Sequence, residues 1–437
     1  MAKIAIIGSG ISGLGAAYLL NRHHDITVYE KDRSPGGHAR TVTVDYGGEQ
    51  IAVDTGFIVF NEPNYPHLSA LFRHLGVPTH RNDMSFAATI RDGWLEWGAK
   101  DLNALFGQRR NLLRPNFARL SHDVFRFNAR AERLVAADPG LTLDGMIAAL
   151  GLGDWFRRYY LLPMCSAIWS CPPGEMLRFP ALTLIRFMAN HRLLSANGQP
   201  QWYTVTGGSR EYVTRLTQSF SHRIRTGCAA VRVTRNAMGA TVSDARGEQR
   251  SFDHVVFAGH ADDTLRILSD AGPDERAALS AFRYQKNLAV LHSDPAAMPK
   301  RRRCWASWNY LSDGDATEPA LSVTYWMNRL QGIADDCPIF VTLNPKRPIA
   351  DDKTFETHRF EHPVFDHAAI AAQSRIQAMQ GARNTWFCGA HLRYGFHEDG
   401  LASAVHVARL LGAPAPWQAA KPEFAEPSMP AEIERAA

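Results

Sequence analysis

The chain has 437 residues, 45% of them hydrophobic, so it can bury a large core and form two interwoven domains. Its 48 basic and 43 acidic side chains leave a net charge of +5, which is too diffuse to indicate a nucleic-acid partner but fits weak attraction to an anionic membrane. The six cysteines form no CxxC pair, so zinc, iron-sulfur and dithiol centres lack support and no metal is expected, and no apolar run reaches the roughly 18 residues of a spanning helix. We expect a cytoplasmic protein, at most in peripheral contact with the inner face of the cytoplasmic membrane, and its oligomeric state is left open.

The first motif is an apolar strand that runs directly into a glycine-rich turn. Gly8, Gly10 and Gly13 have GxGxxG spacing, with Ile11 and Ser12 between them. Gly8 permits the tight turn, Gly10 lets a pyrophosphate approach the backbone, and Gly13 allows the following helix to pack closely on the strand. The helix that begins at Ser12 then directs its N-terminal amides toward the phosphates.

An acidic residue ends the second predicted strand. Glu30 follows the glycines by about 20 residues, where a carboxylate can accept hydrogen bonds from the two ribose hydroxyls. A carboxylate in this place repels a 2′-phosphate, which disfavours NADP. Together with Lys31, which follows directly, these residues predict an adenine-dinucleotide site.

Two further turns follow the acidic residue. The first is Gly36-Gly37-His38-Ala39-Arg40-Thr41, and the second contains Thr55 and Gly56 after Asp54. Paired glycines let the backbone pass close to a ligand, and the Arg40 guanidinium can neutralise a pyrophosphate.

The order of these motifs resembles the flavin amine oxidase, protoporphyrinogen oxidase and phytoene desaturase superfamily. Its middle motif reads GGRxxT, so His38 replaces the first arginine of the pattern. The resemblance implies an α/β fold, in which a Rossmann-like FAD-binding domain of the amine oxidase type is interwoven with an α+β substrate domain. It also implies FAD as the cofactor, with the backbone of Val231 holding the adenine.

A closing motif lies near the C-terminus. Phe387-Cys388-Gly389-Ala390 is a strand and glycine turn, and a helix is predicted from Gly400 to Leu411. The superfamily ends in the same way. The resemblance implies that amides near Gly400 and Leu401 stabilise the negative charge that a reduced flavin develops near N1 and O2.

The motifs divide the chain into discontinuous parts. The first insert is rich in aromatic residues and methionine, which mostly form core but also fit an apolar tunnel. The predicted parts are an FAD-binding domain at 1–75, 205–265 and 381–412, a substrate domain at 76–204 and 266–380, and a weakly ordered tail at 413–437.

Two basic stretches lie in the substrate domain. Residues 109–119 mix arginines with apolar side chains, and residues 300–303 form a run of four positive charges. Basic residues beside exposed apolar ones suit a segment that lies at a membrane interface. Solvated surface charge is the alternative interpretation of each stretch.

Nearly the whole chain resembles a bacterial branch of the superfamily that is associated with fatty-acid methyltransferases of the cyclopropane-synthase type. The similarity is carried by residues 54–66, 164–170 and 322–328. It implies a phospholipid acyl substrate, a methyltransferase partner, and desaturation of a methylated acyl chain to a conjugated diene on the route to furan fatty acids. In this reaction an allylic hydride passes to flavin N5 and a base removes a proton. The candidate bases beside the flavin edge are His391, Tyr394, His397 and Glu398.

Three other functions remain open. An amine oxidase is less favoured, because Tyr394 and Phe396 are the only ring candidates for an aromatic cage. A carotenoid or porphyrinogen dehydrogenase shares the need for an apolar cavity. A non-catalytic FAD-containing lipid-binding partner of a methyltransferase would bind the cofactor without being reduced by lipid. No second GxGxxG is present, so the electrons should leave to oxygen, a quinone or another carrier.

Overall fold

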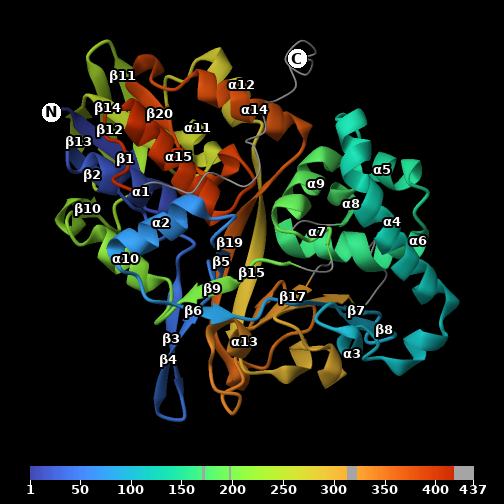
Figure 1. The fold of residues 1–437 in the computed structure, drawn as a ribbon. Helices are drawn as coiled ribbons and strands as arrows, with labels where there is room; N and C mark the ends of the chain where they lie inside the picture. The colour runs from blue at the N-terminus through green and yellow to red at the C-terminus, as the bar shows by residue number, and fades with distance from the viewer. Residues whose placement is uncertain (170–172, 196–197, 313–321, 418–437) are drawn as a thin grey trace.

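A parallel sheet assembled from distant parts of the chain contains β1 (Lys3–Ile7), the strand that runs into the first glycine turn (Figure 1). The computed structural model describes residues 1–169, 173–195, 198–312 and 322–417. Every pairing in this sheet is parallel, which confirms the predicted α/β class. In spatial order its strands are β10 (Ile224–Arg225), β2 (Asp25–Tyr29), β1 (Lys3–Ile7), β14 (His254–Phe257) and β20 (Thr385–Phe387).

Alternate residues of β1 point to opposite faces of the parallel sheet. Apolar residues lie on both faces, and other elements cover both. Ile4 and Ile6 share one core with four helices, and Ala5 lies in the core on the other face. The first face packs against α1 (Ile11–Leu20), α2 (Pro66–Leu75), α10 (Arg210–Thr217) and α15 (His397–Leu410). The second packs against α11 (Ala261–Ile267), α12 (Pro273–Leu279), α14 (His367–Ala378) and the meander β11 (Ala230–Asn236), β12 (Gly239–Asp244) and β13 (Gln249–Phe252).

A second, mixed sheet begins with two long strands that lie side by side below the parallel sheet (Figure 1). Its strands are, in order, β19 (Thr354–Val364), β15 (Arg283–His292), β18 (Phe340–Leu343), β17 (Ser322–Trp326), β16 (Trp308–Ser312), β7 (Phe86–Ile90) and β8 (Leu95–Gly98). Smaller units are the hairpin β3 (Thr41–Tyr46) with β4 (Glu49–Asp54), the sheet β5 (Phe60–Asn61), β9 (Trp202–Val205) and β6 (Thr79–Asn82), and helix α13 (Met327–Gln331).

A helical layer covers one end of the mixed sheet, at the right of Figure 1. Most of the aromatic and methionine side chains of the first insert form the core of this layer, together with Tyr310 from β16. The layer consists of α3 (Leu102–Leu105), the 3₁₀ helix η1 (Arg109–Leu113), α4 (Pro115–Ala137), α5 (Leu143–Ala149), α6 (Asp154–Phe156), a π-helical turn at Arg157–Leu161, α7 (Leu162–Trp169), α8 (Pro173–Met176) and α9 (Ala181–Asn190).

The packing differs from two predicted boundaries. Helices α12 and α14, which the sequence placed in the substrate insert, share a core with β14 and β20 of the parallel sheet. The predicted tail begins too early, because Ala413 is buried and the Trp417 ring lies 6.3 Å from the Tyr18 ring of α1. Residues 418–437 lie outside the described part of the chain. Among the described helices, none has the length and apolar character needed to cross a bilayer.

Candidate functional site

The glycine turns meet at the carboxyl end of β1. A Cβ on Gly13 would lie 1.9 Å from the Gly8 carbonyl oxygen, so the helix can approach the strand only because this residue is glycine. The Gly36 amide donates to the Ser9 carbonyl at 2.9 Å, and a Cβ on Gly37 would lie 3.0 Å from the Gly10 Cα. On Gly10 itself, an added Cβ would meet nothing within 4 Å, so its backbone borders open space.

Glu30 is fixed by a residue that the sequence analysis passed over. Its buried carboxylate accepts hydrogen bonds from the Ser9 amide at 3.0 Å and from the Ser9 hydroxyl at 2.5 Å. Its other oxygen accepts from the Asp32 amide at 2.8 Å, while Lys31 is exposed. The carboxylate is therefore oriented beside the first turn, and the oxygen that accepts from Asp32 keeps a lone pair for a ribose hydroxyl. The residue pattern G-S-G already carried this signal, since a hydroxyl next to the first glycine can reach an acidic residue.

The second and third turns are joined through His38. Its carbonyl oxygen accepts from the Phe57 amide at 2.7 Å, and a Cβ on Gly56 would lie only 2.1 Å from the same oxygen. The Thr55 amide donates to the Arg40 carbonyl at 2.9 Å. Both turns are consequently held as one unit against the first turn.

Asp54 organises this unit from behind. It is buried and accepts from the Thr41 hydroxyl at 2.6 Å and from the amide and hydroxyl of Ser209, each at 2.8 Å. Burial raises the pKa of Asp54 to about 6, against the lowering effect of these hydrogen bonds. The Thr41 hydroxyl therefore holds the turns together through its hydrogen bond to the buried Asp54.

Arg40 has a partner within the protein. Its guanidinium forms an ion pair with Glu356 of β19 and lies 3.4 Å from the Thr55 hydroxyl. Arg40 therefore links the second turn to the mixed sheet, and its contact with a pyrophosphate stays a prediction.

Val231 lies at an irregularity in β11. The pairing with β12 passes from Ala230 and Asp244 to Arg232 and Ser243, which leaves Val231 without a partner in the ladder. A bulged residue has backbone groups that are free of the sheet. Its side chain is 50% exposed, so the backbone is accessible to a ligand such as an adenine base.

The C-terminal motif begins earlier than the sequence predicted. Helix α15 begins at His397, because the Asp399 carboxylate accepts from the Phe396 amide at 2.9 Å and from the Tyr394 amide at 3.3 Å. Gly400 donates its amide to the Phe396 carbonyl, so it is not a free helix-terminal donor. The amides that the helix itself leaves unused belong to its first turn, residues 397–399.

Gly400 and Leu401 instead determine how α15 crosses α1. A Cβ on Gly400 would lie 2.8 Å from the Ser12 hydroxyl and 2.9 Å from Ile11 Cγ2. Leu401 is fully buried and contacts α1 at Gly15. The Gly389 amide donates to the Ser403 hydroxyl at 2.9 Å, which ties the preceding turn to the same helix. Both residues adjoin the site, and the helix amides near them that could face a flavin are those of residues 397–399.

Glu398 has a structural role that conflicts with its prediction as a base. Its two carboxylate oxygens accept from the His67 and Leu68 amides of α2, both at 2.9 Å. Burial raises the pKa of Glu398 to about 8, so this carboxyl is largely protonated at neutral pH. Glu398 thus connects the N-termini of two helices.

The other candidate bases lie around the same turn. His391 is buried, meets the Phe282 ring edge to face at 4.8 Å, and has a pKa lowered by burial to about 3. The ring of His397 stacks on Phe57 at 4.0 Å, its Nε2 lies 2.6 Å from the Tyr212 hydroxyl, and burial lowers its pKa to about 3. Burial also raises the pKa of the Tyr394 phenol. All three side chains are uncharged at neutral pH.

His38, His260 and His362 form a cluster of histidines, of which only His38 was predicted from the sequence. The His362 ring lies 5.3 Å from His38, and the His260 ring stacks on Tyr284 at 4.1 Å. Burial lowers the pKa of all three histidines, that of His362 to about 4. In the part of the chain that the structure describes, His38 Nε2 has no hydrogen-bond partner, so it can bond to a ligand. The period-two pattern His358, Phe360, His362 on one strand could have revealed this face.

These observations fit a dinucleotide that lies along the joined turns. The open backbone at Gly10 suits a pyrophosphate, Glu30 suits a ribose, the bulge at Val231 suits an adenine, and the orphaned nitrogen of His38 suits a polar ring edge. The site therefore belongs to a dinucleotide-binding redox protein.

Comparison with known proteins identifies the family. The model of the family "Flavin containing amine oxidoreductase" matches residues 11–294, and the chain belongs to this family. It is a flavin-dependent oxidoreductase. Over 81 residues the chain is 37% identical to the lysine-specific histone demethylase 1 homolog 2 of Oryza sativa subsp. japonica. The matched region is 18% of this chain and only 10% of the length of the demethylase.

Solved structures share the fold over nearly the whole chain. A CLA-producing fatty acid isomerase from P. acnes is 17% identical, with a TM-score of 0.65 over 93% of this chain and 98% of its own. A variant of putrescine oxidase is 14% identical, with a TM-score of 0.71 over 94% of this chain and 99% of its own. Reduced UDP-galactopyranose mutase is 16% identical, with a TM-score of 0.66 over 94% of each chain. At these identities the likeness establishes the fold.

Proposed function

We propose that this flavoenzyme uses FAD to desaturate a methyl-branched unsaturated acyl chain of a phospholipid, giving a conjugated diene on the route to furan fatty acids. A fatty-acid methyltransferase is the class of enzyme that would supply such a substrate. The fold that the chain shares with a fatty acid isomerase is consistent with an acyl substrate.

The observation that carries this proposal is that three candidate bases of the closing motif are uncharged, while Arg393 and Asp399 pair with each other at 3.8 Å. His391 and His397 have pKa values lowered to about 3, and the pKa of Glu398 is raised to about 8, so all three are neutral near pH 7. Where the helical layer meets this motif, the rings of Phe187 and Phe396 stack at 5.1 Å. An apolar substrate loses little hydration in such surroundings, whereas a cationic amine would lose much.

A cavity beside the closing motif supports an amphiphilic ligand. Its volume is about 440 Å³, and it lies between the end of the helical layer and the end of β19. A Cβ on Gly395 would touch the ring of Phe365, so the cavity adjoins the Tyr394 to Phe396 segment. Its lining combines apolar side chains such as Met176, Phe179 and Phe365 with charged ones, and among these Arg283 pairs with Asp366 at 3.2 Å. Apolar walls suit an acyl chain, and a charged end of the cavity suits a polar headgroup.

The reaction removes a hydride and a proton from adjacent positions of the acyl chain. Bound FAD would supply the two-electron oxidant that accepts the hydride. The C–H bond that breaks is allylic. It is weak because the adjoining double bond spreads the positive charge that the departing hydride leaves on the acyl chain. This chain contributes apolar walls that exclude water and orient the reacting carbon. We propose that the proton passes to the neutral imidazole of His391 or His397, since both oxygens of Glu398 are already occupied by α2.

The test is anaerobic reduction of the purified holoenzyme. Mixed with a phospholipid that carries a methylated monoene, the flavin absorbance should bleach and a conjugated-diene absorbance should appear in equal amount. Replacing the proton acceptor, by His391→Asn or by His397→Asn, should slow this reduction at least roughly 100-fold in one of the two variants.

Matched substrates separate the alternatives. The same phospholipid with an unmethylated saturated chain should leave the flavin oxidised. Bleaching by amines, carotenoid precursors or porphyrinogens, but not by the methylated lipid, would assign the enzyme to one of those other reactions. A flavin that stays oxidised with every one of these compounds would contradict a catalytic function.

A further inference from the structure

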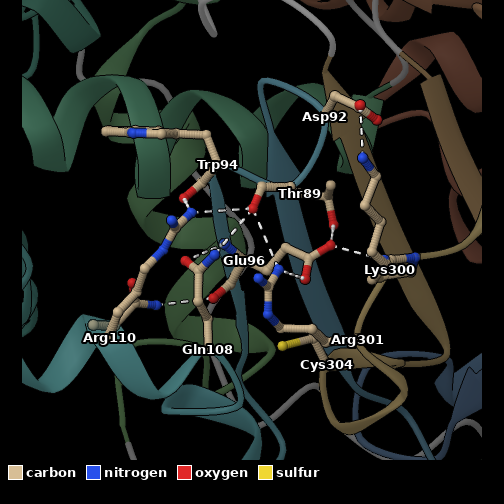
Figure 2. A network of polar contacts seen from close by, with 12 residues as sticks. Thr89, Asp92, Trp94, Glu96, Gln108, Arg110, Lys300, Arg301 and Cys304 are labelled. Carbon is tan, nitrogen blue, oxygen red and sulfur yellow. Dashed lines mark hydrogen bonds and ion pairs between the residues drawn. The ribbon is translucent and has the colours of Figure 1, made fainter.

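The two basic stretches of the substrate domain meet at one edge of the mixed sheet, around the hairpin of β7 and β8 (Figure 2). In Figure 2, Lys300 points toward Asp92 and Arg301 points toward the buried Glu96, at 2.7 Å and 2.6 Å. The charges of Lys300 and Arg301 are therefore compensated within the protein, and Arg302 lies over the Trp305 ring at 4.0 Å. Solvated or paired charge is the better interpretation of residues 300–303.

The other basic stretch is bonded differently. Arg110 donates to the Trp94 carbonyl, as Figure 2 shows, and Arg109 donates to the Phe106 carbonyl at 3.0 Å and the Asn103 side chain at 2.6 Å. These acceptors are all neutral. Within residues 1–169, 173–195, 198–312 and 322–417, neither arginine has a carboxylate at ion-pair distance, so both keep an uncompensated charge on an exposed segment.

Buried amides fix the backbone of this segment. Gln108 donates to the Gly93 carbonyl at 3.0 Å and accepts from the Glu96 amide at 3.2 Å. Asn111 donates to the Glu96 carbonyl at 2.9 Å. The 3₁₀ helix η1 is thus anchored to the hairpin at two places, and the residues between and after them cannot turn inward without breaking these bonds.

The anchored segment presents large apolar side chains to solvent. Leu112 is 61% exposed and Leu113 is 87% exposed, and Leu102 of the neighbouring helix α3 is 74% exposed. We call Leu102, Arg109, Arg110, Leu112 and Leu113 the η1 edge. Exposure of leucine side chains to water is unfavourable, so their transfer into an apolar environment is favoured. Uncompensated arginines beside them attract anions.

Charge continues along the helix that follows. Residues 109–133 contain seven arginines and only two acidic residues, Asp123 and Glu132, so this short segment holds an excess as large as that of the entire chain. Figure 1 shows α4 at the outer side of the helical layer, away from the parallel sheet. An anionic surface with an apolar interior complements this combination, because it accepts leucines and pairs with arginines at the same boundary.

We propose that the η1 edge docks the enzyme on an anionic lipid bilayer, with Leu112 and Leu113 inserted below the headgroups and Arg109 and Arg110 at their level. Docking would bring the proposed lipid desaturase to its substrate, and only this purpose rests on the proposed function. The docking itself needs no catalysis.

The test is co-sedimentation of the full-length holoenzyme with vesicles of equal parts phosphatidylglycerol and phosphatidylcholine. Wild type should bind, and added salt or pure phosphatidylcholine should weaken the binding. The double variant Leu112→Ser with Leu113→Ser should partition roughly tenfold or more weakly, because two apolar side chains no longer enter the bilayer.

A matched control is Met238→Ser, which removes an exposed apolar side chain from the β11–β12 turn and should bind as wild type does. Equal binding of wild type and the double variant, or equal loss in the control, would overturn the proposal. So would light scattering that shows a wild-type dimer and a monomeric double variant, since the η1 edge would then join two copies. Vesicle binding without any lipid oxidation would instead reject the desaturase and leave the docking surface intact.

Discussion

Glu398 is the side chain whose acidity the fold changes in the most consequential way. A carboxyl whose pKa is raised to about 8 in the folded state holds a proton that the unfolded chain releases near its usual value of 4.5. Between these values the folded state binds more protons, so stability falls as pH rises. One pKa unit corresponds to about 1.4 kcal/mol, which sets the largest slope per pH unit that this residue can contribute.

The prediction is that Glu398→Gln flattens the decline of unfolding free energy between pH 6 and pH 8. Asp399, with a pKa raised to about 6, contributes its own decline below that range, against the rise that buried histidines with lowered pKa values produce there. Chemical denaturation at a series of pH values measures both. Glu132→Gln, at an exposed position of α4, is the control and should reproduce the wild-type profile. An unchanged slope in the Glu398 variant would show that this carboxyl is ionised throughout.

Among the secondary-structure elements, the crossing of α1 and α15 depends on glycine at position 400. Gly400→Ala would place a methyl group 2.8 Å from the Ser12 hydroxyl and 2.9 Å from Ile11, so α15 must move away from the first glycine turn. Overpacking of this kind costs about 1–3 kcal/mol, and the displaced turn should also bind flavin more weakly. Thermal unfolding and flavin titration measure the two effects.

Gly174→Ala gives the matched comparison. Among the described residues, an added Cβ there meets nothing within 4 Å in α8, so alanine should leave stability unchanged or raise it by up to about 1 kcal/mol through its helix propensity. A Gly400 variant as stable as the Gly174 variant would mean that the helix crossing tolerates a side chain.

Sequence patterns predicted the elements around the glycines but not the contacts between remote ones. The strand, the turn at Gly8 and the helix after it were predictable, because close approach requires glycine at those positions. The start of α15 was misplaced at Gly400, although acidic residues at 398 and 399 are typical of a first helical turn. The partner of Arg40 could not be predicted, since Glu356 approaches it only through the pairing of β19 with β15.

At the scale of the whole molecule, we expect bound FAD to hold together segments that are remote in sequence. FAD that contacts Gly10, Glu30 and Val231 would bind only the folded state. At a concentration 100-fold above its Kd, such a ligand adds about 2.7 kcal/mol to stability. We predict that FAD raises the melting temperature of the deflavinated protein, and that FMN, which lacks the adenine half, raises it much less. Equal effects of the two flavins would remove Glu30 and Val231 from the cofactor site.

The arrangement of the parallel sheet also has a consequence during synthesis. Strand β1 pairs with β2 on one side and with β14, residues 254–257, on the other, and the helix that packs against α1 ends at residue 410. During synthesis, β1 therefore lacks one neighbour until residue 257 has been made, and α1 lacks α15 until residue 410 has been made. We therefore expect the first glycine turn to reach its final packing against α15 late in synthesis, and apolar residues of α1 to stay exposed until then.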